Sequence, residues 1–538
     1  MDGFLAPSAM IDSTPLPMRV RDLAAEEPNR TILVDIDNDR VVSRREFDEE
    51  VDRWARALSA VEVGPGHTVV TMQPTSAEAL AVWIGLGRLT AIEVPLNTQL
   101  RAHLLSYVLK DTGARVAIVH SRFLDQVLEV LPDCPGIEHV IVTGDERLID
   151  DSRISQGVDF LHRGADSDLE GLAPPRLSNT AAIVYTSGTT GRSKGVIVPW
   201  AQLQTTASWS PTPAAGLGSD DIAYVPFPIF HISVRSPVAT MIMHGGVAVI
   251  RERFSTATFW DDVRRHGCTY GQLLAGMTHL LLALPPSETD ADNPLRVLNI
   301  VPMASSYREI EERFGVRLGT IFTMTEISVP FATIDWRVED PSSCGRLRPG
   351  CEARLVDDDD REVGDGEPGE LIVRTSEPWT LMAGYWNKDA ETARAWRNGW
   401  FHTGDVFRRD ERGLYFFVDR KKDSIRRRGE NISSLELESL IVRHPAVLEA
   451  AVVGVASPDA DLGFTDESVR AFIVLGEGED VHPRDLRRDL EAHVPRFMLP
   501  RYIDIVSELP HTPTFKVRKV DLRAEPISAD TWDAEASR

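Results

Sequence analysis

The chain has 538 residues, too many for a single hydrophobic core, so at least two domains are expected. Its composition, with 42% hydrophobic and 26% charged residues, is that of a soluble globular protein. The formal net charge of −24 argues against a nucleic-acid partner, because binding to a phosphodiester backbone needs a basic face, but it still allows a local nucleotide pocket.

Neither the amino terminus nor the apolar segments predict export or membrane insertion. The first 13 residues carry an early acid and lack the basic region and apolar core of a signal peptide. The most apolar window, residues 77–96, is interrupted by Glu78, Arg88 and Glu93, so it falls short of the roughly 20 apolar residues of a spanning helix. The four cysteines show no metal-ligand spacing. We therefore expect a cytoplasmic protein without a membrane partner, whose oligomeric state stays open.

Helix-like and β-rich runs alternate through the first part of the chain. Residues 47–60 and 76–89 have helical apolar spacing, whereas residues 67–72 and 114–120 are typical of buried strands. This strand–helix–strand rhythm predicts parallel sheets covered by helices.

The pattern changes twice further along the chain. Residues 344–420 hold short strands separated by tight turns such as GDGEPG and DERG, which predicts a small β-rich subdomain. The charge run DRKKDSIRRR at 419–428 is either a solvated face or a hinge between domains. After it, helices are expected at 435–443 and 484–493, and strands at 450–455 and 469–475.

The most informative segment is AAIVYTSGTTGRSKGVIVP, residues 181–199. Two strand patterns flank a loop that combines three glycines, five hydroxyl side chains and Lys194. Glycines allow close backbone approach to a phosphate, hydroxyls donate hydrogen bonds and lysine supplies charge. The spacing is not that of a Walker A loop. A phosphate-binding loop is therefore expected, with a flexible hairpin as the alternative.

The segment YTSGTTGRSKG resembles the signature loop of the adenylate-forming superfamily, which contains acyl-CoA synthetases, luciferases and peptide-synthetase adenylation domains. The likeness covers nearly the whole chain, and the further motifs follow in the expected order. The chain is most similar to crotonobetaine/carnitine-CoA ligase-like synthetases. The segments that carry this likeness are PFPIFHI (226–232), ERFGVRLGTIFTMTE (312–326) and the stretch 399–433 that begins GWFHTGDV.

The resemblance implies an α/β fold with two domains. A large N-terminal domain, residues 1–420, would contain two helix-covered mixed sheets and the β-rich subdomain 344–420. A small, mobile α+β domain would follow at 421–538, with Lys422 as the hinge residue. Residues 426–431 would take part in the second half-reaction.

The resemblance also implies sites for ATP, Mg²⁺ and coenzyme A. Glu326 would be the magnesium ligand, since magnesium prefers carboxylate and phosphate oxygens. Asp405 and Arg420 would contact the ribose, and Lys516 would neutralise charge during adenylation. The residues implied to bind the nucleotide are Thr186, Ser187, Gly188, Thr189, Thr190, Gly191, Lys194, Phe322, Thr325, Asp405, Arg420 and Lys516. Those implied to be catalytic are Lys516, Thr325, Glu326 and His231.

Each of these residues has a plainer interpretation when taken alone. A Thr-Glu pair is commonly the start of a helix. The Thr-Gly-Asp sequence before Val406 is a common turn that precedes a β segment. Lys516 stands in a basic stretch and could simply be solvated, and a lone histidine such as His231 is more often structural. The order of the motifs favours the functional interpretation.

The substrate pocket is where the chain departs from the family pattern. By resemblance the pocket includes His231, Val234 and Thr323, and the last two replace frequent glycines. Added bulk and a hydroxyl group favour a small polar acid.

The sequence thus predicts an ATP-dependent, AMP-forming ligase that makes an acyl adenylate and pyrophosphate. Transfer to coenzyme A would follow. The alternative is a different acceptor, an amine or a carrier-protein thiol, including activation of nitrite to diazotise an aromatic amine. A non-catalytic binding protein is disfavoured because Lys194, Glu326, Asp405, Arg420 and Lys516 are all present.

Overall fold

The structure is a computed structural model, and it describes most of the chain. By its contacts the chain forms two compact units. The larger unit is Met1–Ala353 with Val373–Phe401, and the smaller is Arg354–Ile372 with His402–Arg538. The division at 420 expected from the sequence stays a prediction. The described residues are 14–147, 149–169, 171–186, 193–209, 216–334, 336–421, 425–427, 430–456, 467–491, 493–494, 496–511 and 516–536.

The first sheet of the larger unit has eight strands, in the order β20-β9-β8-β4-β3-β5-β6-β7. Strands β3 to β8 pair in parallel, whereas β9 is antiparallel to β8 and β20 is antiparallel to β9. The strands are β3 (Thr68–Met72), β4 (Ile92–Pro95), β5 (Val116–His120), β6 (His139–Thr143), β7 (Ile154–Gln156), β8 (Thr180–Thr186), β9 (Lys194–Pro199) and β20 (Gly384–Tyr385).

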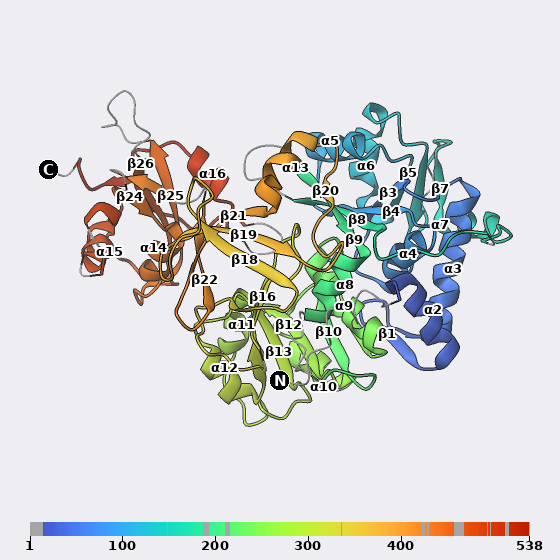
Figure 1. Cartoon of the computed structure of the whole chain (residues 1–538), viewed down its shortest axis with the longest axis horizontal. Coiled ribbons are helices and arrows are strands. Elements are labelled where there is room, and N and C mark those ends of the chain that lie inside the picture. The colour runs from blue at the N-terminus through green and yellow to red at the C-terminus, as the bar shows by residue number, and fades with distance from the viewer. Residues whose placement is uncertain are drawn as a thin grey trace. The chain divides into compact units, whose positions relative to one another are not determined.

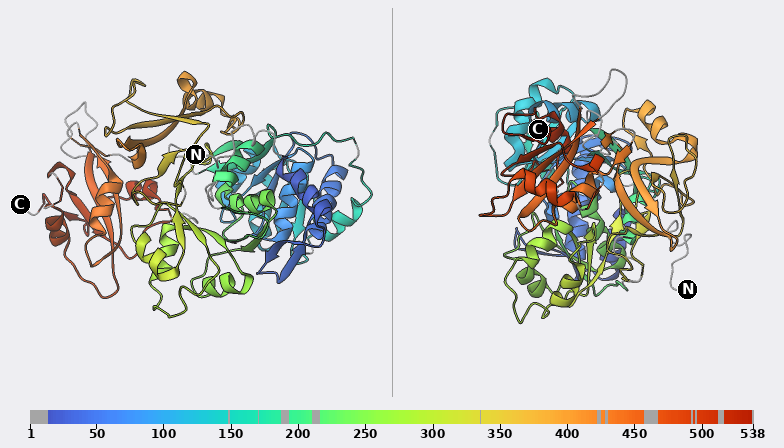
Figure 2. Two further views of the ribbon diagram at one scale, coloured as in Figure 1. Left: turned by 60° about the horizontal axis from the view of Figure 1, so that its bottom comes forward. Right: turned by 90° about the vertical axis from the view of Figure 1, so that its left-hand side faces the viewer.

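The second sheet has seven strands, in the order β14-β13-β12-β10-β11-β1-β2. It is parallel except for β2, which forms an antiparallel pair with β1. Figure 2 shows most of its strands and helices in green and yellow-green. The strands are β1 (Thr31–Asp35), β2 (Arg40–Ser43), β10 (Ile222–Pro226), β11 (Val247–Arg251), β12 (Tyr270–Leu274), β13 (Val297–Val301) and β14 (Arg317–Gly319).

Helices cover both sheets (Figure 1). Helix α4 contacts β4 of the first sheet and β1 of the second, while α8 lies on β8 and β9, and α9 lies on β10 and β11. Helices α8 and α9 also pack on each other, so a helical layer separates the two sheets. The helices are α2 (Leu16–Glu26), α3 (Arg44–Ala60), α4 (Ala77–Arg88), α5 (Ala102–Thr112), α6 (Leu124–Val130), α7 (Gly157–Arg163), α8 (Trp200–Trp209), α9 (Ile232–His244), α10 (Phe259–His266), α11 (Ala275–Leu282), α12 (Tyr307–Phe314) and α13 (Asp389–Ala395).

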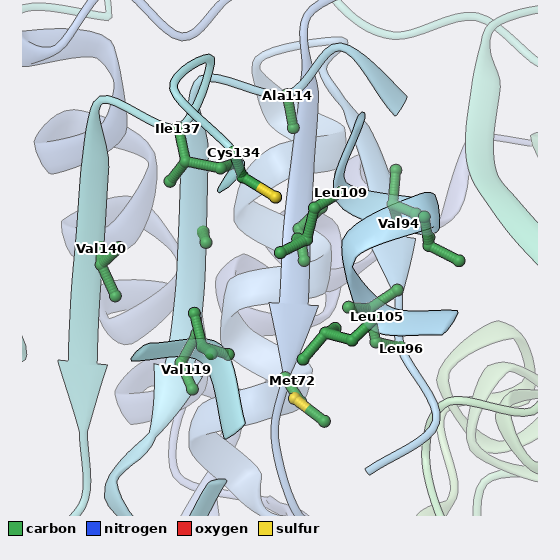
Figure 3. Close-up of a cluster of buried hydrophobic side chains, with 14 of the residues drawn as sticks. Met72, Val94, Leu96, Leu105, Leu109, Ala114, Val119, Cys134, Ile137 and Val140 are labelled. Carbon is green, nitrogen blue, oxygen red and sulfur yellow. The ribbon is translucent and has the colours of Figure 1, made fainter. Parts of the chain in front are cut away.

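The other face of the first sheet is closed by α5 and α6. Figure 3 shows Leu105 and Leu109 of α5 directed at strands that carry Met72, Val94 and Val119. All five side chains are buried. Each fully buried aliphatic side chain of this kind stabilises a fold by about 1.5–3 kcal/mol, so this cluster is a major part of the core.

Between the sheets, two tryptophans pack closely. Trp83 of α4 and Trp200 of α8 stack with ring centroids 5.7 Å apart. Gly87, one turn after Trp83, allows this approach, because a Cβ atom there would lie 2.6 Å from the Trp200 ring and 2.5 Å from Pro17. A side chain at position 87 would force the two helices apart.

Three further strands of the larger unit are short. In the larger unit, β15 (Ile321–Phe322), β16 (Phe331–Ala332) and β17 (Gly345–Leu347) form an antiparallel ribbon. Strands β18 (Cys351–Val356) and β19 (Gly369–Thr375) each cross the boundary between the units.

In the smaller unit, a four-stranded mixed sheet, β25-β26-β27-β28, packs against α14 and α16. The elements that follow β19 and α13 are β21 (Phe401–Arg409), β22 (Leu414–Arg420), β23 (Ile425–Arg427), β24 (Glu430–Ile432), α14 (Ser434–Ile441), β25 (Val447–Ala456), β26 (Glu467–Leu475), α15 (Pro483–Leu490), β27 (Tyr502–Ile505), α16 (Lys519–Ala524) and β28 (Trp532–Asp533).

The predicted α/β class, the strand–helix rhythm and the helices and strands after residue 430 are confirmed. The helix expected from Phe47 begins three residues earlier, at Arg44. Its start is set by a capping box, in which the Ser43 side chain accepts from the Glu46 amide and the Glu46 side chain accepts from the Ser43 amide.

One carboxyl group in the fold predicts a dependence of stability on pH. Burial raises the pKa of Glu78 from 4.5 to about 7, repulsion by Glu50 adds to this, and Arg40 opposes it. The folded state therefore holds the Glu78 proton more tightly than the unfolded chain does, so this group's contribution to stability is lost as the pH rises from about 4.5 to about 7.

Glu78→Gln should therefore raise the free energy of unfolding by about 1–3 kcal/mol at pH 8, and by much less at pH 5. Urea unfolding at both pH values measures the difference. Glu129→Gln, at an exposed position on α6, is the matched control and should change neither value. An equal gain at both pH values would contradict the raised pKa.

Candidate active site

The glycine- and hydroxyl-rich loop joins two adjacent strands of the first sheet. β8 and β9 are antiparallel, and Thr186 at the end of β8 pairs in register with Lys194 at the start of β9. The loop therefore begins and ends at one edge of the sheet. Its predicted nucleotide contacts Ser187, Gly188, Thr189, Thr190 and Gly191 lie outside the described residues.

Lys194 lies between a carboxylate and an aromatic ring. Its Nζ is 2.6 Å from Oε2 of Glu391 and 5.0 Å from the centroid of the Tyr385 ring. The hydrogen bond from Lys194 keeps the pKa of Glu391 below its ordinary value. Both charged side chains are about a quarter exposed, so the ammonium group is accessible to a polyphosphate that would compete with Glu391.

Glu326 belongs to the same cluster. The Tyr385 hydroxyl donates to Oε1 of Glu326 at 3.1 Å, and the amide of Met382 donates to the Glu326 carbonyl at 2.9 Å. The side-chain amide of Gln202 donates to the Thr325 carbonyl at 2.8 Å. Residues 323–326 are not helical, so the interpretation of Thr325-Glu326 as a helix start is wrong.

Glu326 fits a magnesium ion that is bound together with ATP. Among the described residues, no group of three or more His, Cys, Asp or Glu side chains could form a metal cage by itself. Magnesium is usually held by one or two carboxylates plus the phosphate oxygens of a substrate. A single carboxylate with one oxygen already oriented by Tyr385 matches that donor set.

The predicted ribose contacts are neighbours on adjacent strands of the smaller unit. Asp405 of β21 pairs in register with Arg420 of β22, and the Arg420 Nε is 3.6 Å from Oδ1 of Asp405. The expectation that Asp405 lies in a turn before a strand is wrong, because β21 begins at Phe401. Gly404 takes φ +70°, which a glycine adopts without steric cost, and this distorts the strand at Asp405 without ending it.

The buried Glu370 side chain binds β21 and the residue that directly follows β22. Glu370 accepts from the Gly404 amide at 3.3 Å and from Lys421 at 3.1 Å, and Lys421 also pairs with Asp358 at 2.9 Å. Partial burial lowers the pKa of Lys421, but the two carboxylates outweigh it and the pKa is raised. The predicted hinge residue Lys422 follows directly and lies outside the described residues.

Lys516 interacts with the Asp405–Arg420 pair. Loss of hydration lowers the pKa of the Lys516 ammonium group, the positive charge of Arg420 lowers it further, and Asp405 opposes the shift. Part of the Lys516 side chain is exposed to solvent. The charges of Arg420 and Asp405 both lie close enough to act on its ammonium group. The structure thus brings Lys516, Asp405 and Arg420 together within the smaller unit.

His231 and Thr323 lie on different elements of the larger unit. His231 occupies the N-cap position of α9, and its ring is 4.4 Å from that of Phe230. Thr323 directly follows β15, which ends at Phe322, and its hydroxyl donates to the Ser328 carbonyl at 3.0 Å. The Val234 side chain lies outside the described residues.

The segment that ends at His231 is fixed by two side chains. The Thr75 hydroxyl donates to the Phe227 carbonyl at 2.6 Å and accepts from the Ile229 amide at 2.9 Å. The Arg235 Nε donates to the Ile229 carbonyl at 2.8 Å. The Thr75 and Arg235 side chains therefore fix the backbone of residues 227–229, just before His231.

Arg235 forms a buried ion pair. Both terminal nitrogens of its guanidinium group donate hydrogen bonds to the Glu93 carboxylate, and neither side chain is more than 3% exposed. The Thr71 hydroxyl donates to the same carboxylate at 2.6 Å, and the guanidinium lies 4.8 Å from the Trp83 ring centroid. This network links β3, β4 and α9, and so connects the first sheet to the segment before His231.

Sequence reasoning missed Tyr385, Glu391, Glu370 and the Arg235–Glu93 pair. Two signals could have pointed to some of them. Glu93 and Arg235 are opposite charges inside otherwise apolar stretches, which indicates buried partners. Tyr385 stands in a compact Gly-Tyr-Trp sequence. Nothing in the sequence pairs Tyr385 with Glu326.

Comparisons with known proteins identify the family of the chain. The family model for AMP-binding enzymes matches residues 20–386, and the model for their C-terminal domain matches residues 436–516. The chain belongs to the AMP-binding enzyme family. It is an ATP-dependent, AMP-forming ligase of the acyl-CoA ligase kind, so ATP-dependent acyl-adenylate formation and CoA thioester formation are the chemistry of its class.

The relatives match over nearly their full length. The chain is 31% identical over 515 residues to the crotonobetaine/carnitine–CoA ligase of Salmonella paratyphi B, covering 93% of this chain and 97% of the relative. The ligase of the same name from Escherichia coli is 30% identical over 513 residues, with the same coverage. The resemblance predicted from the motifs is confirmed.

Two solved structures have the same fold. The anthranilate CoA ligase AuaEII, in complex with anthranoyl-AMP, matches with a TM-score of 0.84 and 25% identity over 97% of this chain and 98% of that one. ATP-bound MatB from Rhodopseudomonas palustris matches with a TM-score of 0.83 and 23% identity over 95% and 98%. No helix within the described ranges has the length and apolarity needed to cross a bilayer.

The buried Arg235–Glu93 pair predicts a large loss of stability when one partner is neutralised. Glu93→Gln should lower the free energy of unfolding by about 3–5 kcal/mol, because the Arg235 charge is left buried without its counter-charge. Chemical denaturation measures the change.

The matched control is Glu138→Gln. Glu138 pairs with Arg115 at 2.6 Å, but both side chains are 48% exposed, so this change should cost at most about 1 kcal/mol. Similar losses in the two variants would show that the buried pair has no special structural role.

Proposed function

We propose that the enzyme activates a small polar carboxylic acid and transfers the acyl group to coenzyme A. The acid oxygen attacks the α-phosphorus of ATP, and the acyl adenylate forms as pyrophosphate leaves. The coenzyme A sulfur then attacks the acyl carbon, and the carbon–oxygen bond to AMP breaks. A cytoplasmic location, where ATP and coenzyme A are plentiful, is part of this proposal.

The observation that carries the adenylation step is the interaction of Lys516 with Asp405 and Arg420. Asp405 can accept hydrogen bonds from both ribose hydroxyls, and the neighbouring Arg420 adds a cationic donor. Since Lys516 lies within electrostatic reach of Asp405 and Arg420, it would be able to reach the α-phosphate of a nucleotide whose ribose these two residues bind. There its charge would stabilise the negative charge that develops as pyrophosphate leaves.

The cluster in the larger unit holds further residues that are proposed to bind ATP. Lys194 would exchange Glu391 for phosphate oxygens, and Thr186 and Thr325 would donate hydroxyl hydrogen bonds. Glu326 would hold magnesium, which when bound neutralises charge on the triphosphate. Phe322 would contact the base. These roles follow from the motifs and the observed contacts.

The environment of Thr323 supports the choice of a small polar acid. Because its hydroxyl proton is donated to the Ser328 carbonyl, the oxygen is left to accept a hydrogen bond. An acid that carries a hydroxyl or amino group near its carboxylate would satisfy this acceptor. His231 and Val234 would form other parts of the wall of the same pocket.

The second half-reaction would use a rotation at Lys422, which follows the Lys421–Glu370 ion pair. The likeness to CoA ligases over nearly the full chain supports coenzyme A as the acceptor. The test is pyrophosphate release across a panel of short and long acids, and nitrite, with and without coenzyme A. Formation of a thioester, detected by mass spectrometry, is the expected result. Pyrophosphate release with an amine acceptor alone would overturn it.

Lys516→Ala should lower the rate of adenylate formation by about 10²–10³ or more, since one positioned charge is lost at the reacting phosphate. Pyrophosphate release measures this step. Transfer from a synthetic acyl adenylate to coenzyme A should change far less. Arg518→Ala, an exposed cation two residues further along, is the matched control and should leave both rates unchanged. Adenylation by Lys516→Ala at the wild-type rate would rule out this role.

Thr323 variants separate the size of the pocket from its polarity. Thr323→Gly removes bulk and should improve turnover of longer acids relative to short ones, because the β-branched side chain cannot swing aside. Thr323→Val keeps the volume but removes the oxygen, so it should weaken only acids with a donor group. The ratio of kcat/KM values for matched acids measures both effects. Efficient turnover of long fatty acids by the wild type would refute the proposed pocket.

A further inference from the structure

Tyr385 contacts two charged side chains of the larger unit, Lys194 and Glu326. Its ring faces Lys194, with the ammonium nitrogen 5.0 Å from the ring centroid. Its hydroxyl lies 3.1 Å from Oε1 of Glu326. One side chain thus contacts both the lysine of the phosphate hairpin and the carboxylate assigned to magnesium.

The backbone fixes where this ring lies. Tyr385 pairs with Val196 of β9, two residues after Lys194. The Tyr385 amide donates to the Thr392 hydroxyl at 2.9 Å, and the Trp386 amide donates to the Gly195 carbonyl at 2.7 Å. These hydrogen bonds hold the backbone of Tyr385 beside the strand that begins at Lys194.

The phenol can only donate to Glu326. An ionised carboxylate accepts hydrogen bonds and has none to donate, so the Tyr385 hydroxyl is the donor to Oε1 of Glu326. A hydrogen bond on one carboxylate oxygen restricts the rotation of the group and so sets the direction in which the carboxylate would meet a cation. Partners of this kind, one step removed from a metal, control how well the ligand binds.

We propose that Tyr385 is a positioning residue for the metal–nucleotide complex: its hydroxyl orients Glu326 toward the magnesium ion, and its ring aligns Lys194 with the polyphosphate. This inference rests on the proposed function, because it takes Glu326 as the metal ligand. It adds a residue that couples the metal ligand to the phosphate-binding lysine. It assigns the two functions to different parts of one side chain.

The test separates hydroxyl from ring and measures binding instead of turnover. The probes are Mn²⁺, followed by electron paramagnetic resonance, and α,β-methylene-ATP, which cannot form the adenylate. Tyr385→Phe should weaken Mn²⁺ binding in the presence of the analogue by about 10-fold or more. Its affinity for the analogue without metal, measured by calorimetry, should stay at the wild-type value, because the ring still faces Lys194. Tyr385→Leu should weaken both.

The chain offers a matched control for loss of a buried phenol–carboxylate hydrogen bond. The Tyr224 hydroxyl of β10 donates to Asp262 at 2.8 Å, and neither residue belongs to the proposed site. Tyr224→Phe removes the same kind of bond and should leave Mn²⁺ and analogue binding unchanged. A loss of Mn²⁺ affinity in Tyr224→Phe equal to that in Tyr385→Phe would reduce the role of Tyr385 to general stability and overturn the inference.

Failure of this inference differs from failure of the proposed function. If Mn²⁺ does not strengthen analogue binding to the wild type, the metal role of Glu326 is wrong, and the inference falls with it. If the wild type shows metal-dependent binding and Tyr385→Phe keeps it in full, only the inference is overturned.

Discussion

The pairing of β20 with β9 is the constraint on which the cluster of Lys194, Tyr385 and Glu326 in the larger unit depends. The Ala383 amide donates to the Ile197 carbonyl at 3.0 Å, and the Trp386 amide donates to the Gly195 carbonyl at 2.7 Å. β20 has only two residues, and the Trp386 indole, which donates to the Asp111 carbonyl at 3.0 Å, helps these bonds to set its register. A shift by one residue would turn Tyr385 to the opposite face of the sheet and separate Lys194 from Glu326. The phosphate hairpin and the Thr325-Glu326 segment are therefore aligned by main-chain hydrogen bonds.

A second constraint lies between the two sheets. In the sequence, Glu78, Arg88 and Glu93 interrupt the apolar window 77–96 and argue against a membrane helix. In the structure, Arg88 and Glu93 are buried in ion pairs, and Glu78, which is partly exposed, carries a raised pKa. A buried ion pair costs free energy to desolvate, so the Arg235–Glu93 pair contributes a fixed position for the segment before His231 more than it contributes net stability.

The fold class and most element positions could be predicted because they follow from local periodicity. The motif residues could be singled out because they lie in short contiguous segments such as 181–199, and their individual roles stay predictions. The partners of those residues could not be predicted, since they come from far along the chain: Tyr385 is 59 residues from Glu326, and Arg235 is 142 residues from Glu93. The Thr-Gly-Asp segment has the sequence of a turn but lies within β21, because a glycine inside a strand cannot be told from a glycine in a turn by sequence alone.

The boundary between the two units has a consequence for how this fold can be divided. Because the chain passes from one unit to the other after Ala353, back after Ile372 and across again after Phe401, no single cut releases the smaller unit whole. A fragment that starts at His402 would lack Glu370 and Asp358, the two carboxylates that hold Lys421. If two relatives exchanged their C-terminal parts through one junction near residue 402, Asp358 and Glu370 would come from one parent and Lys421 from the other. Shuffled enzymes of this fold should then inherit residues 354–372 and 402–421 from the same parent.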